Sequence, residues 1–290
     1  MRYMSMRAMR ETMLYREFLL ARAGRNSVLR SSTMDFKQPR PAERRAFKSK
    51  IKPYKKNNND IKKSKDYLYT NFDNVEGWCD RVLFEIFDQL ASTEINQKGG
   101  FLEIGVHHGK FYFLVNSIID RKYQSFALDV FDDQSLNIDK SGSGNLQTFK
   151  NNLKNFDAHN EKNTQIISGD STDQTVIKSF DDKIGSFRFI SIDGGHTVEH
   201  TISDLHLASR LICNEGVVIL DDVLNYHWPG VIEGVSYFLK SKPTLIPFAI
   251  GYNKLFLVKL SFHSYYLDAA SNSHLKSKIV DFFGYKTVAL

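Results

Sequence analysis

The chain has 290 residues, of which 42% are hydrophobic, enough for one α/β domain and an extension. No apolar run is long enough to span a bilayer, which excludes a membrane-spanning protein and leads us to expect a soluble, cytoplasmic one. The charge is divided: residues 1–65 hold 19 Lys and Arg against 5 acids, whereas residues 66–290 hold 20 against 28. Nucleic-acid binding is therefore expected only through the basic tail.

The tail differs in composition from the rest of the chain. All six methionines lie in the first 34 residues, and ten of the fourteen arginines lie in the first fifty. Three interpretations compete: an extension upstream of a true start at Met34, a basic arm that touches RNA or anionic lipid, or an organelle-targeting peptide. We favour a disordered or non-native extension over residues 1–65. The two cysteines, Cys79 and Cys213, lie far apart without a partner motif, as is typical of thiols in a reducing compartment.

The first periodic segment predicts a helix over residues 74–93, with Trp78 in the core. An apolar run that contains Phe101, Leu102 and Ile104 then ends in Glu103-x-Gly105-x-x-x-Gly109, and an amphipathic segment follows over residues 110–120. This order predicts a strand, a tight glycine turn and a helix, the first unit of an open α/β sheet. A plain strand-to-helix turn that needs glycine is the alternative explanation of the motif.

The rest of the chain alternates between strand and helix patterns. Strands are predicted over 125–131, 164–169, 187–192 and 216–220, and helices over 146–156, 173–180, 198–212 and 229–239. Residues 245–250 and 255–260 form two more strands whose short link predicts an antiparallel hairpin. The polar loop over residues 132–145 is long enough for a lid, although an ordinary solvated loop is equally compatible. Residues 261–290 predict an edge helix or a dimer contact.

Acidic residues follow nearly every predicted strand, at Glu103, Asp129, Asp170, Asp193, Asp221 and Asp222. The carboxyl ends of parallel strands meet at one edge, where ligands of such sheets bind. Clustered carboxylates repel one another unless a cation or hydrogen-bond donors are present, so the pattern indicates a site for a cationic ligand. The glycine spacing also differs from a dinucleotide fingerprint, which would hold a phosphate.

Residues of about 75–260 resemble class I S-adenosylmethionine (SAM)-dependent methyltransferases, and within them the macrocin-type sugar and natural-product O-methyltransferases. The resemblance rests on five stretches, namely residues 101–110, 127–131, 169–171, 192–196 and 220–223. It implies a Rossmann-like α/β fold: a seven-stranded, mostly parallel sheet with an antiparallel last strand and helices on both faces. The methyltransferase domain would cover residues 66–260, and residues 261–290 would pack on it or on a dimer partner.

The resemblance also implies roles for the strand-end residues. Glu103, Gly105 and Gly109 would line the methionine and ribose side of SAM, Asp129 would bind the ribose hydroxyls, and Asp170 and Ser171 would flank the adenine. Asp193 would border the donor and, with Asp221 and Asp222, would hold a divalent cation such as Mg²⁺. Asp170 could instead cap the helix that follows it.

Methyl transfer to an alcohol also requires that the hydroxyl lose its proton. His196, directly after Asp193-Gly-Gly, is the first candidate base and His227 the second, although a structural role fits either histidine. The expected reaction is O-methylation of a small hydroxylated substrate such as a sugar. Two alternatives remain open: a nicotinamide-dependent oxidoreductase, and a non-catalytic binding module of the same fold.

Overall fold

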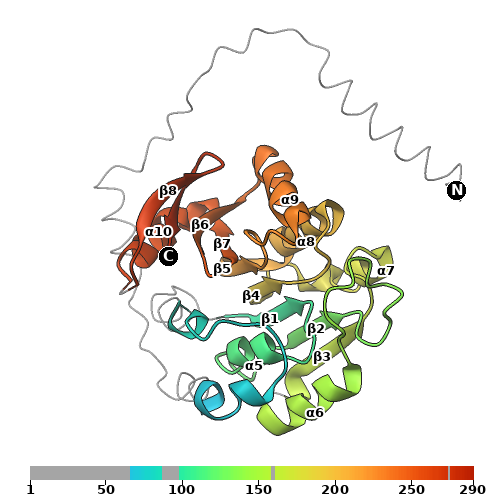
Figure 1. Cartoon of the computed structure of the whole chain (residues 1–290). Coiled ribbons are helices and arrows are strands. Elements are labelled where there is room, and N and C mark those ends of the chain that lie inside the picture. Colours follow the sequence, from blue (N-terminus) through green and yellow to red (C-terminus); the bar gives the residue numbers. More distant parts are fainter. Residues whose placement is uncertain (1–65, 87–97, 158–160, 274) are drawn as a thin grey trace, which may run out of the picture. The chain divides into compact units, whose positions relative to one another are not determined.

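The computed structural model describes residues 66–86, 98–157, 161–273 and 275–290, all within one unit, Lys52–Leu290. A nine-stranded sheet runs through the domain in the order β3-β2-β1-β4-β5-β7-β6-β9-β8 (Figure 1). The strands are β1 Gly100–Ile104, β2 Ser125–Asp129, β3 Thr164–Ser168, β4 Phe187–Ile192, β5 Ile212–Leu220, β6 Leu245–Gly251, β7 Lys254–Lys259, β8 Lys278–Phe282 and β9 Tyr285–Ala289. The helices are α5 Lys110–Asn116, α6 Leu146–Phe156, α7 Gln174–Lys178, α8 Val198–Leu211, α9 Pro229–Lys240 and α10 His263–Ser271.

The sheet is parallel where crossover helices join its strands and antiparallel where a tight turn does. Strands β1 to β5 pair in parallel, and β7 runs antiparallel to both β5 and β6. The predicted Rossmann-like architecture with an antiparallel last strand of the core sheet is confirmed. Strand order reverses at β1, which pairs with both β2 and β4, so a ligand crevice is expected at this point.

Two apolar layers cover the sheet because successive strand residues point to opposite faces. In β1, Phe101 packs with α5, α6 and α10, whereas Leu102 and Ile104 pack with α8 and α9. The strand is buried along its whole length, as expected for a central parallel strand. The carboxyl ends of the strands are left to carry polar residues.

The predicted helix over residues 74–93 is wrong in its first half. Residues 72–74 form a short 3₁₀ turn, residues 75–80 are irregular, and helical structure begins at residue 83; residues 87–93 lie outside the described residues. Trp78 is not in the core, since 74% of its surface is exposed. The helical spacing of apolar residues gave a wrong prediction because Trp78 lines a cavity and does not pack in the core.

The C-terminal segment contains more than an edge helix. Helix α10 packs against β6, and the hairpin β8–β9 extends the sheet, with β9 parallel to β6. The sheet therefore has nine strands rather than the predicted seven. Among the described residues, none of the helices has both the length and the apolar character that crossing a membrane requires.

Candidate functional site

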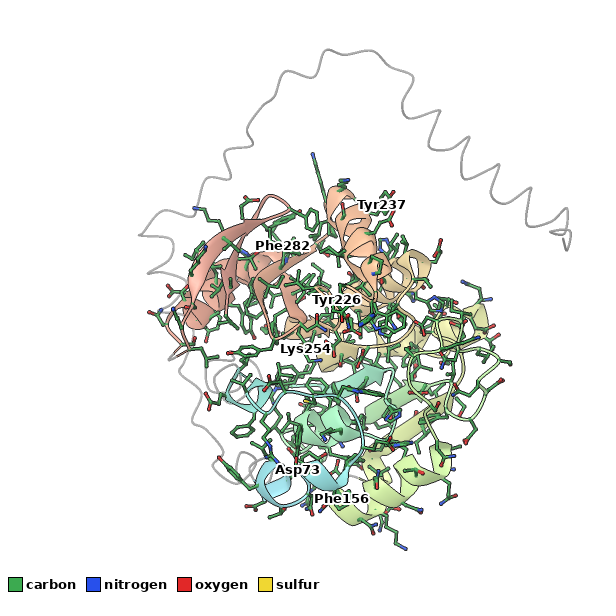
Figure 2. All side chains as sticks on the ribbon, in the orientation of Figure 1. Asp73, Phe156, Tyr226, Tyr237, Lys254 and Phe282 are labelled. Atoms are coloured by element: carbon green, nitrogen blue, oxygen red, sulfur yellow. The ribbon has the colours of Figure 1, made fainter. Side chains whose placement is uncertain are left out.

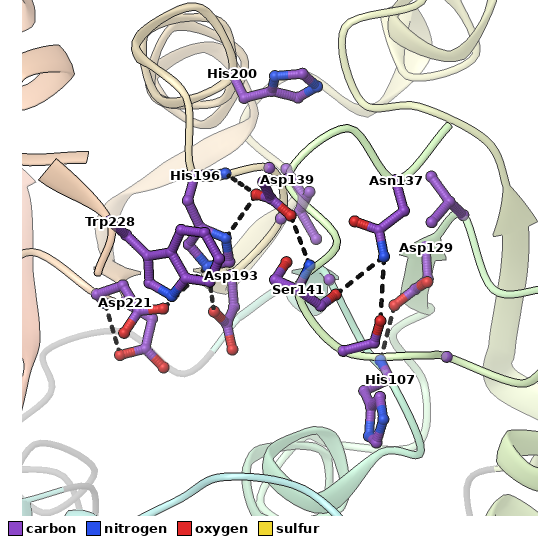
Figure 3. A pocket seen from close by; sticks show the side chains of 18 of the residues that line it. His107, Asp129, Asn137, Asp139, Ser141, Asp193, His196, His200, Asp221 and Trp228 are labelled. Carbon is purple, nitrogen blue, oxygen red and sulfur yellow. Dashed lines mark hydrogen bonds and ion pairs between the residues drawn. The ribbon is translucent and has the colours of Figure 1, made fainter. Parts of the chain in front are cut away.

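A cavity of about 730 Å³ opens at the carboxyl ends of the parallel strands (Figure 3). Five of the six predicted acids line it: Asp129, Asp170, Asp193, Asp221 and Asp222. These residues come from four different strand ends but share one space, as the sequence predicted. The cavity therefore concentrates negative charge, which favours a cationic ligand.

Asp129, at the end of β2, binds the backbone of the neighbouring turns. Its Oδ2 accepts hydrogen bonds from the backbone N–H groups of Val106 (2.6 Å) and His107 (2.7 Å), and its Oδ1 accepts one from Phe131 (2.6 Å). These donors stabilise the carboxylate and fix the turn between β1 and α5. Oδ2 already accepts two bonds, but Oδ1 can accept one more, so Asp129 can still bind a ligand hydroxyl.

The two glycines of the β1–α5 turn are explained by packing. Gly105 has φ +82°, and a Cβ there would lie 1.8 Å from the Asp193 carbonyl oxygen. Gly109 has φ +92°, and a Cβ there would lie 2.5 Å from the Phe113 ring. Gly105 lines the cavity, whereas Gly109 is buried beside α5. Their requirement for glycine therefore follows from positive φ and close approach to protein atoms.

Glu103 lies below the cavity and not on its wall. The side chain is buried on the α5 face of β1, and burial raises its pKa well above the usual range, reinforced by Asp193 and opposed by Lys254. A carboxyl in this setting tends to be neutral. Its expected contact with the donor stays a prediction.

Asp170 and Ser171 follow β3 and form another part of the wall. Asp170 Oδ1 lies 3.3 Å from Nε2 of His200 and accepts hydrogen bonds from the backbone and hydroxyl of Thr172. The cap of α7 is Asp173, whose carboxylate accepts the backbone N–H groups of residues 175 and 176. Asp170 is therefore not the cap of that helix and remains directed to the cavity.

His196 is the centre of the opposite wall. Asp139, from the loop over residues 132–145, accepts hydrogen bonds from the His196 backbone N–H (2.7 Å) and lies 2.8 Å from its Nδ1. The ring stacks on Trp228 with centroids 4.6 Å apart. This loop contributes a large part of the cavity wall, so it is not a freely solvated connection. Figure 3 shows Asp139 and Trp228 on either side of the imidazole.

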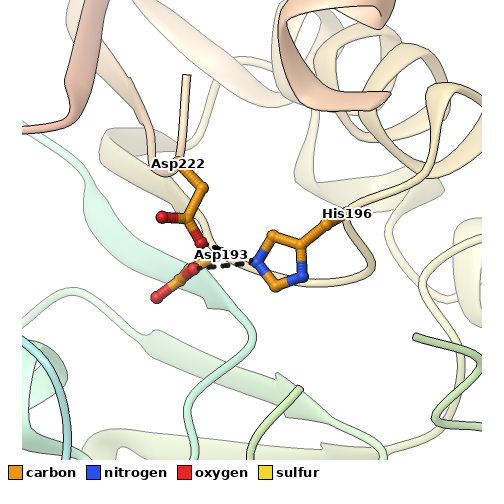
Figure 4. A group of neighbouring side chains, drawn as sticks. All are labelled: Asp193, His196 and Asp222. Atoms are coloured by element: carbon orange, nitrogen blue, oxygen red, sulfur yellow. Dashed lines mark ion pairs between the residues drawn. The ribbon is translucent and has the colours of Figure 1, made fainter. Parts of the chain in front are cut away.

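The other ring nitrogen of His196 faces two strand-end acids (Figure 4). Nε2 lies 2.9 Å from Asp222 Oδ2 and 3.7 Å from Asp193 Oδ1. Burial opposes a charge on the ring, but the bonds to Asp139, Asp193 and Asp222 outweigh it and raise the pKa of His196 to about 11. The imidazole is thus a cation among carboxylates.

Asp221 takes a different partner from its neighbour Asp222. Its carboxylate forms an ion pair with Lys254, whose ammonium group is buried at the start of β7. Asp222, with φ +59°, turns its Oδ1 to the amide groups of Asn225 and Asn253. Of the three predicted metal-binding acids, only Asp193 and Asp222 therefore lie with His196 as a group whose ligand atoms are within 4.8 Å of one another.

Other residues lie where the sequence did not indicate them. His227 is exposed, stacks on Tyr226 and does not line the cavity, whereas Trp78 and Tyr252 line its mouth. The sequence did not indicate Asp139, because it lies in a loop without periodicity. Lys254 had a detectable signal, since a lysine directly after a hairpin turn opens a strand whose next four residues are all apolar.

A family description agrees with this arrangement. Residues 102–223, from β1 to just past Asp222, match the family model described as a methyltransferase domain. Residues 102–223 therefore resemble a methyltransferase domain. The resemblance that the motifs predicted is confirmed, and the family match and the fold together support a SAM-dependent methyltransferase. Lys254 lies outside the matched residues of the methyltransferase domain.

The chain is also similar to individual known proteins. An uncharacterized protein, R132, of Acanthamoeba polyphaga mimivirus is 25% identical over 166 residues, which cover 57% of this chain and 70% of that protein. The solved O-methyltransferase NovP is 16% identical, covers 69% of this chain and 78% of its own, and gives a TM-score of 0.46. An O-methyltransferase from Bacillus cereus, solved with SAH, is 15% identical over 74% of this chain and 96% of its own, with a TM-score of 0.46.

Proposed function

We propose that the chain is a SAM-dependent O-methyltransferase that acts on a small hydroxylated acceptor such as a sugar or natural product. The observation that carries the proposal is the single cavity in which strand-end carboxylates face His196 across the switch point of the sheet. A positively charged methyl donor offsets the repulsion among these carboxylates, which a phosphate-bearing dinucleotide would increase.

The donor would occupy the wall formed by β1, β2 and β3. Gly105 and Asp129 lie at the first two strand ends, and Asp170 and Ser171 at the third. Asp129 already has its orientation fixed by three backbone N–H groups, so its remaining acceptor capacity is aimed without further ordering of the side chain. Ribose hydroxyls of SAM could donate hydrogen bonds to this carboxylate.

The acceptor would occupy the wall formed by β4, β5 and the loop over residues 132–145. Asp139 orients the His196 ring so that Nε2 faces Asp193 and Asp222. Asp139 holds Nδ1, so Nε2 is the ring nitrogen that faces the acceptor. It can take the proton when a cation binds Asp193 and Asp222 but not the ring, and it is a ligand instead of a base when the cation also binds Nε2. Trp78 and Tyr252 offer exposed aromatic faces at the mouth, which suit a ring-bearing, uncharged acceptor.

The group formed by Asp193, His196 and Asp222 fits a divalent cation. Two carboxylate oxygens and one imidazole nitrogen lie close enough for a single ion, and Asn225 and Asn253 hold Asp222 in place. Mg²⁺ prefers oxygen ligands, whereas imidazole also suits transition metals. A cation bound there would polarise the acceptor hydroxyl.

Isothermal titration with SAH, the demethylated product of SAM, tests the donor site. NAD is titrated in parallel because it is the ligand expected for the oxidoreductase alternative. We expect SAH to bind and NAD to show no heat of binding. Transfer from methyl-labelled SAM to a panel of sugars and phenolic glycosides then tests the reaction, and His196→Ala should lower the rate at least roughly a hundredfold. Binding of NAD without SAH would replace this proposal by the oxidoreductase, and SAH binding without transfer to any acceptor would favour a binding module.

A further inference from the structure

Lys254 is a buried cation inside the wall of the acidic cavity. It opens β7, after the turn that joins β6 to β7, and only 3% of its surface is exposed. Figure 2 shows it in the interior of the domain, between the C-terminal strands and β1. Its ammonium group pairs with Asp221 and lies 4.8 Å from the centroid of the Phe111 ring. Both contacts hold the charge at one position.

The surroundings of Lys254 keep it charged. Burial alone would lower its pKa, but Asp221 and then Asp193 raise it above the usual value of a lysine. The partly buried Cys79 thiol, whose pKa is raised to about 12 by desolvation, is neutral and adds no competing anion. A buried ammonium beside a carboxylate is stable only as a pair, so Asp221 and Lys254 are each committed to the other.

The two adjacent acids after β5 are thereby assigned to different cations. Asp221 belongs to Lys254, while Asp222 faces His196 through Oδ2. Asp222 also has a positive φ of +59°. The carboxylate that a metal would otherwise use as a third ligand is already neutralised by an amino-acid side chain.

We propose that Lys254 is the resident cation at Asp221, so that a divalent ion in this cavity uses Asp193, Asp222 and His196 and leaves Asp221 out. This inference rests on the proposed function, because it concerns the ion-binding group of the same cavity. Lys254 thus sets how many carboxylates the ion can reach, because it holds Asp221 away from the ion.

A double-mutant cycle measured with Mn²⁺ alone tests the proposal. Binding is followed by electron paramagnetic resonance for the wild type, Asp221→Asn, Lys254→Met and the double variant, with Lys259→Met as the control at the other end of β7. We expect Asp221→Asn to change Mn²⁺ affinity less than about threefold, because Asp221 is not a ligand. Lys254→Met should tighten binding roughly tenfold, and adding Asp221→Asn in that background should remove the gain.

The quantity measured is the coupling between Asp221→Asn and Lys254→Met in their effects on Mn²⁺ affinity. The loss of one charge at each position would change the affinity additively and would give no coupling. A loss of affinity from Asp221→Asn that is equally large with and without Lys254 would overturn the proposal, as would Mn²⁺ binding that Lys254→Met leaves unchanged or an absence of binding in all four proteins. Binding by Lys254→Met alone, with none by the wild type, supports it. The double variant lacks both charges and guards against misfolding of the single variant.

SAH titration of the same proteins separates the two proposals. If SAH fails to bind the wild type while the Mn²⁺ cycle shows the expected coupling, the donor assignment fails and the role of Lys254 stands. If SAH binds all variants alike and the coupling is absent, the reverse holds.

Discussion

The two walls of the cavity balance their negative charge in different ways. On the β1–β3 wall, Asp129 is satisfied by backbone N–H groups from residues close to the strand ends. On the β4–β7 wall, Asp222 and Asp221 face the side-chain cations His196 and Lys254. The bonds to Asp129 are built into the course of the backbone, whereas the pairs on the β4–β7 wall, like that between Asp170 and His200, depend on individual side chains that a single substitution can remove.

This difference has a consequence for how each wall can respond to ligands. The backbone N–H groups that bind Asp129 do not themselves titrate near neutral pH, so these hydrogen-bond donors are present throughout that range. The acceptor wall carries exchangeable charges, since an ion or a substrate can compete with a side-chain cation for the same carboxylate. Substitutions that neutralise acids should therefore affect the two walls unequally.

The largest effect is expected on the acceptor wall, from Lys254→Met. The variant leaves Asp221 buried without its partner, so the free energy of unfolding should fall by about 3 to 5 kcal/mol. Urea unfolding followed by circular dichroism measures the change. The double variant Asp221→Asn/Lys254→Met should recover most of the loss, and a double variant as unstable as the single one would show that Lys254 acts through packing on Phe111 instead.

A second test concerns Asp204 on α8, a fully buried acid whose charged neighbour Asp170 is also an acid. Burial raises its pKa to about 7, and the Ser171 hydroxyl only partly opposes this. The unfolded carboxyl ionises near pH 4 while the folded one stays protonated to about pH 7, so this residue makes stability fall as pH rises through that window.

Asp204→Asn should remove this pH dependence. We expect equal stability of variant and wild type at pH 4, and a variant that is more stable by about 2 to 4 kcal/mol at pH 7.5. Thermal or urea unfolding at both pH values measures the difference. A variant that is less stable than the wild type at pH 7.5 would mean that the ionised carboxylate is already compensated in the folded protein.

A smaller effect is expected on the donor wall. Asp129→Ala removes the acceptor of three backbone N–H groups at a half-buried site that water can reach, so it should lower stability by about 1 to 3 kcal/mol. It should also weaken SAH binding at least roughly tenfold, which titration measures. Asp129→Asn keeps one acceptor oxygen and should lose less on both counts, whereas equal losses would point to the charge alone.

The same contrast explains what the sequence could and could not predict. Local patterns defined the strands closely: β4 was predicted at its observed bounds, and the β6–β7 hairpin followed from its short link. The acids could be assigned to one edge because parallel strands bring their carboxyl ends together. The position of Asp129 at this edge also explains why backbone N–H groups of the neighbouring turns bind it. The sequence did not predict that there would be three such bonds.

The acceptor wall was less predictable because its partners are distant in sequence. Asp139 lies 57 positions before His196, and Lys254 lies 33 positions after Asp221. No periodicity connects such pairs, so the third metal-binding acid was expected to be free. The exposed Trp78 and the hairpin β8–β9 were missed for a related reason, since neither a rim position nor an added sheet edge changes the local pattern.

The smallest effect is expected from His227→Ala, which sharpens the assignment of the acceptor wall. His227 is exposed and contacts Tyr226 outside the cavity lining, whereas His196 lies within it and is held by Asp139. Methyl transfer by His227→Ala should therefore stay within about twofold of the wild type under conditions in which His196→Ala loses most of its rate. If both variants lost activity equally, the segment over residues 224–228 would have to move over the cavity during turnover, and the wall formed by Trp228 would then belong to a closing element.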